Sequence, residues 1–165
     1  MEIKYAYFAG GCFWCISPIF VDTKGVKSVI SGYCGGDEIN PTYEDVKAQK
    51  TNHRETIRIE YDEDEVSYKQ LLDIFFDNVD LYDDGGQYID RGHSYTLAVY
   101  YNDEDEKIIV DNKIKEYKNP IYVSVEKYKE FYKAEEYHQD YYLKNPKEFE
   151  EELINSGRKT KWEKT

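Results

Sequence analysis

Two thiols and two aromatic rings stand together directly after a glycine pair, in the segment GGCFWC at positions 10–15. Residues 3–9 favour a β-strand, and residues 13–20 are apolar enough to form a short buried helix. We therefore expect Cys12 where a strand turns into a helix. At a helix N-terminus, unpaired N–H groups and the helix dipole favour an anion, and the thiolate is the reactive form of cysteine. The pattern predicts redox chemistry by an exposed, ionised Cys12.

Other interpretations of these cysteines are possible. A free cysteine is most often a small buried hydrophobic residue, although the glycine pair and the helix start argue against this for Cys12. The pair Cys12 and Cys15 fits either a redox pair or half of a zinc site, which needs four ligands. The other thiol and imidazole groups are Cys34, His53, His93 and His138, with no second C-x-x-C and no H-x-x-x-H. A zinc site is therefore disfavoured, and we expect no bound metal.

Glu55 is the second residue with chemical potential. It opens an alternating stretch in which its carboxyl group shares one strand face with Ile57 and Ile59. Burial would raise its pKa, and a carboxyl group that stays protonated near neutral pH can act as a general acid. Alternation alone favours the simpler interpretation of an edge residue that points to solvent or pairs with Arg54 or Arg58.

The elements that must position these residues alternate between strands and helices. The remaining strands are expected at 26–33, 55–61, 95–101 and 121–126, and the remaining helices at 67–79 and 103–118. Ser67 and Gln70 form a capping box for the first of these helices. Segment 37–54 has no clear period and is expected as an extended, functional loop, and segment 83–94 is expected as a loop rich in glycine and aspartate. Glycines on both sides of Cys34 indicate a mobile loop.

This order predicts an α+β fold, with helices packed on a central mixed or antiparallel sheet. More specifically, we expect a ferredoxin-like plait with long loops. Residues 1–165 would form a single catalytic domain, with about 127–165 as an extended, irregular, partly helical tail that wraps it. A terminal amphipathic segment is expected near 149–154.

Composition excludes several classes of function. The net charge of −12 disfavours nucleic acid and anionic membranes as partners and favours a monomer. The first residues show no charged-then-apolar leader, and no apolar run approaches the roughly 18 residues of a membrane span. Three cysteines, two of them in one C-x-x-C, suit a reducing compartment. We therefore expect a cytoplasmic protein.

Six blocks of residues, in order from about residue 5 to 146, resemble the peptide methionine sulfoxide reductase A family. They are GCFW at 11–14, GY with GG at 32–36, NPTYE at 40–44, HRE at 53–55, DRG with SY at 90–95, and FYKAEEYHQ at 131–139. Several blocks at family-like spacing are far more specific than a single motif.

The resemblance implies reduction of the S epimer of methionine sulfoxide, free or in proteins, with Cys12 as the nucleophile that becomes a sulfenic acid. It implies no bound cofactor and thioredoxin or another thiol as the electron donor. The other implied site residues are the acid Glu55, the phenols Tyr43 and Tyr95 that hydrogen-bond the sulfoxide oxygen, Asp90 lining the site, and Phe13 and Trp14 around the methyl group.

The chain also departs from the family pattern. No thiol follows Cys34, so Cys15, Cys34 or an external reductant must resolve the sulfenic acid, and the C-x-x-C spacing favours Cys15. His93, Ser94 and Thr96 replace the usual residue types around Tyr95. Two further functions remain open: a thioredoxin-like thiol-disulfide oxidoreductase that uses Cys12 and Cys15, and a non-catalytic module that binds oxidised methionine.

Overall fold

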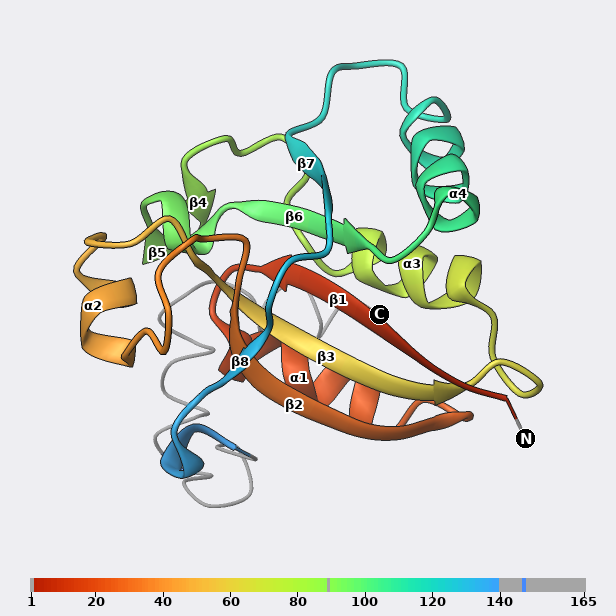
Figure 1. Ribbon diagram of the computed structural model, residues 1–165. Helices are drawn as coiled ribbons and strands as arrows, with labels where there is room; N and C mark the ends of the chain where they lie inside the picture. The colour runs from red at the N-terminus through yellow and green to blue at the C-terminus, as the bar shows by residue number, and fades with distance from the viewer. Residues whose placement is uncertain (1, 89, 140–146, 148–165) are drawn as a thin grey trace.

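A six-stranded mixed sheet forms the centre of the molecule in the computed structural model, which describes residues 2–88, 90–139 and 147 (Figure 1). Its strand order is β7-β6-β1-β3-β2-β8, and every neighbouring pair is antiparallel except the parallel pair β6 and β7. The strands are β1 (Ile3–Gly10), β2 (Val26–Cys34), β3 (Arg54–Asp62), β6 (Leu97–Tyr101), β7 (Val123–Lys127) and β8 (Tyr132–Lys133). The predicted α+β class with a mixed central sheet is confirmed.

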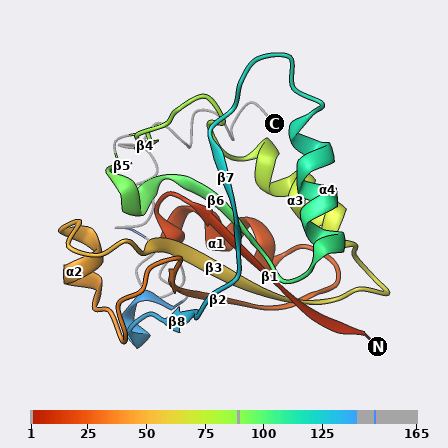
Figure 2. The ribbon, with the colours of Figure 1, turned by 45° about the horizontal axis from the view of Figure 1, so that its top comes forward.

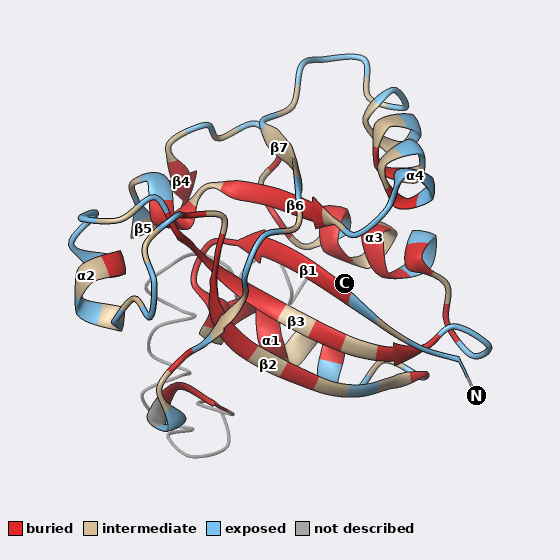
Figure 3. Ribbon diagram, viewed as in Figure 1, coloured by how far each residue is buried: buried red, intermediate tan, exposed pale blue. Residues whose placement is uncertain are grey.

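The helices α1, α3 and α4 pack against this sheet. Figures 1 and 2 both show α1 (Phe13–Val21) against β1, β3 and β2, with α3 (Tyr68–Asp77) beside α4 (Glu104–Ile114). Most residues of β1, β3 and β6 are buried, and these strands are largely red in Figure 3. Phe8 of β1 stacks on Phe75 of α3 with ring centroids 4.8 Å apart, and Ile57 and Ile59 of β3 lie in the same core. The opposite face carries a separate small cluster that includes Cys34 and Tyr100.

Local sequence signals account for α3. The Ser67 side chain accepts the Gln70 N–H at 3.1 Å, and the Gln70 side chain accepts the Ser67 N–H at 2.8 Å, so the predicted capping box is present. Its buried stripe includes Leu71, Leu72 and Phe75. The helix ends at Asp77, two residues before the expected boundary.

The segments expected as loops contain short elements. Within 37–54 lies α2 (Tyr43–Lys47), whose N-cap Thr42 accepts the Asp45 N–H at 3.2 Å. Within 83–94 lie β4 (Gly86–Gln87), β5 (Asp90–Arg91) and the 3-10 turn η1 (His93–Tyr95). The strand expected from residue 95 therefore begins only at Leu97. Tyr95 belongs to a turn, so the direction of its side chain is not set by the alternation of side chains along a strand.

The chain after β7 returns along the other edge of the sheet. β8 pairs with β2 through Gly32 and Tyr33, and the 3-10 turn η2 (Glu136–His138) follows it. The expected amphipathic segment at 149–154, and most of the expected tail, lie outside the described residues. Among the residues that the structure describes, no helix combines the length and apolarity needed to cross a membrane.

Candidate active site

Cys12 is the N-cap residue of α1, directly after the end of β1. The glycine pair before it has a structural reason. A Cβ on Gly10 would lie 2.8 Å from the Phe75 ring, and Gly11 has φ 91°, a left-handed conformation that favours glycine. The predicted strand-to-helix position of Cys12 is confirmed.

The prediction that Cys12 is exposed and ionised is wrong. Cys12 is only 8% exposed. Its pKa is raised well above the usual value, first by a hydrogen bond with the Cys15 thiol, then by burial, and then by Cys15, Glu55 and Asp90 nearby. A helix N-terminus favours a thiolate, but here burial and neighbouring acidic groups outweigh it. The resting thiol is therefore protonated.

Glu55 lies on the same side of the sheet as α1, with 1% of its surface exposed. Its Oε1 accepts the Phe13 N–H at 3.3 Å, and its Oε2 is buried as well. Burial raises its pKa to about 8, and Asp90 adds to the rise, while the Phe13 N–H and the Tyr95 hydroxyl lower it. The interpretation of Glu55 as a solvent-facing or arginine-paired edge residue is wrong. At neutral pH this carboxyl group holds a proton.

The other groups expected at the site surround this pair. The pKa of Tyr95 is raised by burial first, and then by the proximity of Glu55, Tyr43, Cys12 and Asp90. Tyr43 comes from α2, Asp90 from β5 and Tyr95 from η1, so three segments far apart in the sequence converge. The structure thus brings together all five residues expected to be catalytic.

A group of packed aromatic rings, which we call the aromatic wall, lines one side of the site. Phe13 and Trp14 have centroids 6.1 Å apart, and Tyr43 lies 6.3 Å and 6.0 Å from them. The centroid of the His138 ring lies 4.2 Å from that of Tyr43, with the two ring planes tilted by 51°, and His138 Nδ1 accepts the Trp14 Nε1–H at 3.1 Å. Burial lowers the pKa of His138 to about 4, so its ring is neutral at pH 7. The wall is apolar, with small polar edges.

His138 was not among the site residues expected from the sequence, although it lies in the block at 131–139 that carries part of the family resemblance. Two more residues of this block anchor the wall. Glu135 accepts the Tyr33 hydroxyl at 2.8 Å and the Tyr43 N–H at 3.1 Å. The Gln139 side chain accepts the Ser31 N–H at 2.9 Å and donates to the Ser31 carbonyl at 2.9 Å. We call residues 132–139 the strap, because they tie the aromatic wall to the edge of β2.

Comparison with known proteins identifies the family. The model of the family described as peptide methionine sulfoxide reductase matches residues 4–165. The chain is 44% identical to peptide methionine sulfoxide reductase MsrA 2 of Staphylococcus aureus, over 96% of this chain and 93% of that protein. The chain belongs to the peptide methionine sulfoxide reductase family.

Solved structures of the reductase family share its fold. Methionine sulfoxide reductase A of Corynebacterium diphtheriae is 27% identical with a TM-score of 0.81, over 88% of this chain and 76% of that chain. Reduced Mxr1 of Saccharomyces cerevisiae is 26% identical with a TM-score of 0.80, over 88% and 87%. Mxr1 has also been solved in complex with Trx2, and that chain is 18% identical with a TM-score of 0.54, over 82% and 83%.

The two further cysteines of this reductase family member occupy different surroundings. Cys15 is 2% exposed, one helical turn from Cys12, and its thiol is hydrogen-bonded to the Cys12 thiol. Cys34 is fully buried at the end of β2, in the cluster on the opposite face of the sheet, and burial raises its pKa to about 12. The expectation of a mobile Cys34 is wrong, because the strand pairing of β2 continues through this residue.

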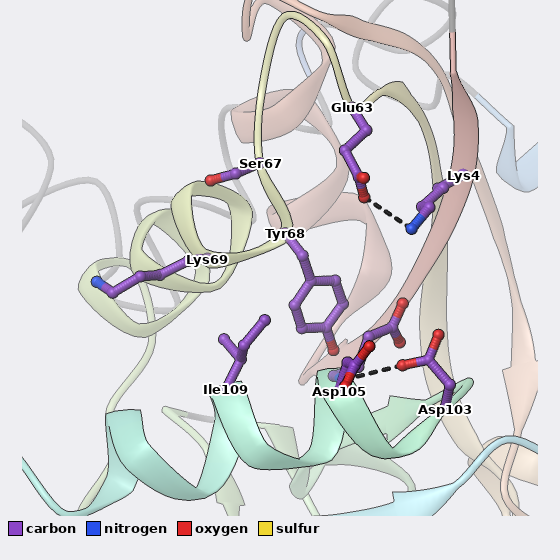
Figure 4. Close-up of a pocket in the computed structure, with 9 residues that line it drawn as sticks. Lys4, Glu63, Ser67, Tyr68, Lys69, Asp103, Asp105 and Ile109 are labelled. Carbon is purple, nitrogen blue, oxygen red and sulfur yellow. Dashed lines mark hydrogen bonds and ion pairs between the residues drawn. The ribbon is translucent and has the colours of Figure 1, made fainter.

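A hollow outside this reductase site is drawn in Figure 4. It has a volume of about 380 Å³ and lies between the start of β1 and the first turns of α3 and α4. Lys4 in this hollow is paired with Glu63 at 2.9 Å, and none of its lining residues is a cysteine. It has no part in the chemistry described above.

Proposed function

We propose that this protein reduces the S epimer of methionine sulfoxide, free or in proteins, to methionine through a sulfenic acid on Cys12. The observation that carries this proposal is the protonated, buried carboxyl group of Glu55 in the same cluster as the Cys12 thiol. A sulfoxide is a poor electrophile until its oxygen is protonated or strongly hydrogen-bonded. A neutral carboxylic acid beside the nucleophile can donate that proton.

The chemistry balances with these groups alone. Glu55 gives its proton to the sulfoxide oxygen while Tyr43 and Tyr95 donate hydrogen bonds to it, and the Cys12 sulfur then attacks the electrophilic sulfur. The Cys12 proton replaces the one that Glu55 lost. The hydroxyl group passes to Cys12 as methionine leaves. A thiol and a sulfoxide thereby become a sulfenic acid and a thioether, and Glu55 ends protonated.

The remaining residues bind and orient the substrate. The rings of Phe13 and Trp14 form an apolar surface that suits a methyl group on sulfur. Neutral His138 extends this surface without adding a charge. Asp90 lines the site and, by raising the pKa of Glu55, helps to keep that acid protonated.

We propose that Cys15 resolves the sulfenic acid. Its thiol attacks the Cys12 sulfur, a disulfide forms and water leaves, and a dithiol donor then reduces the disulfide. The hydrogen bond between the two thiols supports this choice, and the burial of Cys34 on the opposite face argues against the alternative. We propose thioredoxin as the donor, since the related Mxr1 has been solved in complex with Trx2. No cofactor takes part in this cycle.

Other properties of the molecule belong to the same proposal. We propose a single catalytic domain over 1–165 that works as a cytoplasmic monomer. The segment β1-α1-β2-β3-α3-β6 has the βαββαβ order of a ferredoxin-like plait, and its strands lie in the order β6-β1-β3-β2. This order supports the assignment of that plait to the core.

The function is tested with the Cys12→Ser variant, assayed on the separate S and R epimers of methionine sulfoxide with dithiothreitol. We expect the wild-type protein to reduce the S epimer and the variant to lose at least about 10³-fold in kcat, since the nucleophile is removed. A Cys34→Ser variant is the matched control and retains activity. Turnover by Cys12→Ser at the wild-type rate would contradict the proposal. Reduction of insulin disulfides without sulfoxide reduction would favour the thioredoxin-like alternative.

The resolving thiol is tested by counting free thiols after one equivalent of substrate without reductant. With Cys15 as the resolving residue, the wild-type protein and Cys34→Ser each lose two thiols, because a disulfide forms. Cys15→Ser loses only one and keeps a sulfenic acid that dimedone labels. Loss of two thiols by Cys15→Ser, and of one by Cys34→Ser, would assign the role to Cys34.

A further inference from the structure

The short turn η1, which carries Tyr95, is held by an unusual set of side-chain contacts. The first is a reciprocal pair between Gln49, which follows α2, and Ser94. Gln49 Nε2 donates to Ser94 Oγ at 2.7 Å, and the Ser94 N–H donates to Gln49 Oε1 at 3.1 Å. Ser94 is 1% exposed and Gln49 is exposed, so both bonds lie at the edge of the protein interior and are partly buried.

Gln49 makes these contacts from a strained backbone position. Its φ is 62°, in the left-handed region that non-glycine residues rarely adopt. Gly92 lies directly beneath it with φ 119°, and a Cβ on Gly92 would be 2.7 Å from the Gln49 Cδ. Such conformations persist only where the surrounding structure holds them, and they concentrate at functional sites.

The second contact joins η1 to the strand that carries Glu55. Arg54 Nε donates to Thr96 Oγ1 at 2.8 Å, and Thr96 Oγ1 in turn donates to the His93 carbonyl at 2.7 Å. Arg54 is itself fixed, because its Nη1 donates to the Tyr100 hydroxyl at 3.0 Å and to Glu126 at 2.6 Å. Thr96 therefore connects the guanidinium group of Arg54, the residue that precedes Glu55 in β3, to the backbone of the turn that carries Tyr95.

A third contact completes the set, since His93 Nε2 lies 2.9 Å from the Asn52 carbonyl. Each of the residues at 93, 94 and 96 thus reaches the single segment 49–54, which leads directly into Glu55. We call these three side chains and their partners in that segment the η1 clasp. Tyr95 is the one residue of 93–96 whose side chain takes no part in the clasp and lies among the catalytic groups instead.

We propose that the η1 clasp positions the Tyr95 phenol against Glu55, so that His93, Ser94 and Thr96 are positioning residues for the reaction. This inference rests on the proposed function. A hydrogen-bond donor stabilises developing charge only when it is held in place before the reaction, and a short 3-10 turn has too few bonds of its own to do so. The clasp supplies the missing constraints from the strand that bears the acid.

The test is a double-mutant cycle on kcat/KM for methionine S-sulfoxide. Ser94→Ala and Thr96→Val each remove one clasp hydroxyl with little change of shape, and each is made in the wild-type protein and in Tyr95→Phe. We expect about a tenfold loss in the wild-type background, since misplaced groups are costly in catalysis, and less than about twofold in Tyr95→Phe. Equal losses in both backgrounds would overturn the proposal. Thr23→Val, whose hydroxyl donates to the Ile19 carbonyl at the far end of α1, is the matched control and should behave like wild type.

The pH dependence of kcat provides a readout that a purely structural role would not move. The Tyr95 hydroxyl lowers the pKa of Glu55, so a loosened Tyr95 raises it, and the fall in activity on the alkaline side moves to higher pH. The other groups that face Glu55 are Asp90, the thiols of Cys12 and Cys15, and the Phe13 N–H, which the variants leave unchanged. An unmoved alkaline limb in both clasp variants would count against the proposal. If the wild-type protein does not reduce the sulfoxide, the proposed function fails instead.

Discussion

Glu55 combines a catalytic advantage with a cost in stability. Its folded pKa of about 8 lies above the usual value of 4.5, so the folded state binds more protons than the unfolded state between these pH values. Stability therefore falls as pH rises from about 4.5 through about 8. We expect Glu55→Gln, which cannot ionise, to be more stable than wild type at pH 8.5, on the order of a few kcal/mol, and similar at pH 4.5. Urea unfolding at the two pH values measures this difference.

The control for this prediction is Glu44→Gln on the exposed side of α2, which also removes one negative charge. A similar gain at pH 8.5 for Glu44→Gln would show that the overall charge is responsible and would contradict the assignment to Glu55. Activity should separate the two variants as well. Glu55→Gln loses the acid that protonates the sulfoxide, whereas Glu44→Gln keeps it.

At the scale of elements, the strap decides whether the aromatic wall is in place. Gln139 makes three hydrogen bonds to backbone groups, one from the Ser31 N–H and one each to the Ser31 and Ala134 carbonyls. Gln139→Ala leaves the buried Ser31 N–H without this partner and releases η2 with His138. We expect KM for methionine sulfoxide to rise about tenfold with a smaller change in kcat, because binding surface is lost while the acid and the nucleophile stay.

Steady-state kinetics and thermal unfolding of Gln139→Ala measure these effects together. Lys133→Ala is the matched control, because its exposed side chain lies on the same strap, with Nζ 3.8 Å from the exposed Glu136 carboxylate. A fall in kcat at unchanged KM would show that the strap acts on the chemistry and not on binding, contrary to the prediction.

The sequence predicted those elements whose signals are local. The capping box of Ser67 fixed the start of α3, and the alternation from Glu55 placed that carboxyl group on the face of Ile57 and Ile59. Alternation alone does not reveal that this face packs under α1. For that reason the pattern favoured a Glu55 that points to solvent. The protonated state of Cys12 has a similar cause, since its pKa is raised first by the Cys15 thiol and then by burial, with smaller effects of Glu55 and Asp90, and this burial exists only in the folded chain.

Long-range contacts account for the other differences. Glycines beside Cys34 suggested mobility, but the pairing of β2 with β3 continues through Cys34 and Arg54. The turn that carries Tyr95 is held by the segment 49–54, which no local pattern links to it. The departures from the family pattern at 93, 94 and 96 were visible in the sequence. The role that we propose for these three residues together, as the η1 clasp, could be inferred only from their contacts in the folded structure.

At the scale of the whole molecule, the net charge of −12 acts on every substrate that approaches the site. Such a field attracts cationic peptides and repels anionic ones over distances comparable to the Debye length, which falls from about 30 Å at 0.01 M salt to about 3 Å at 1 M. We therefore expect kcat/KM for a methionine sulfoxide peptide flanked by lysines to exceed that for a glutamate-flanked peptide at low salt. The two values should converge as salt is added, with a fall of about three- to tenfold in kcat/KM for the lysine-flanked peptide.

Stopped-flow measurements across this range of salt, with the uncharged N-acetyl amide of methionine sulfoxide as control, test the expectation. Parallel salt dependence for all three substrates would show that the acidic surface plays no part in substrate encounter.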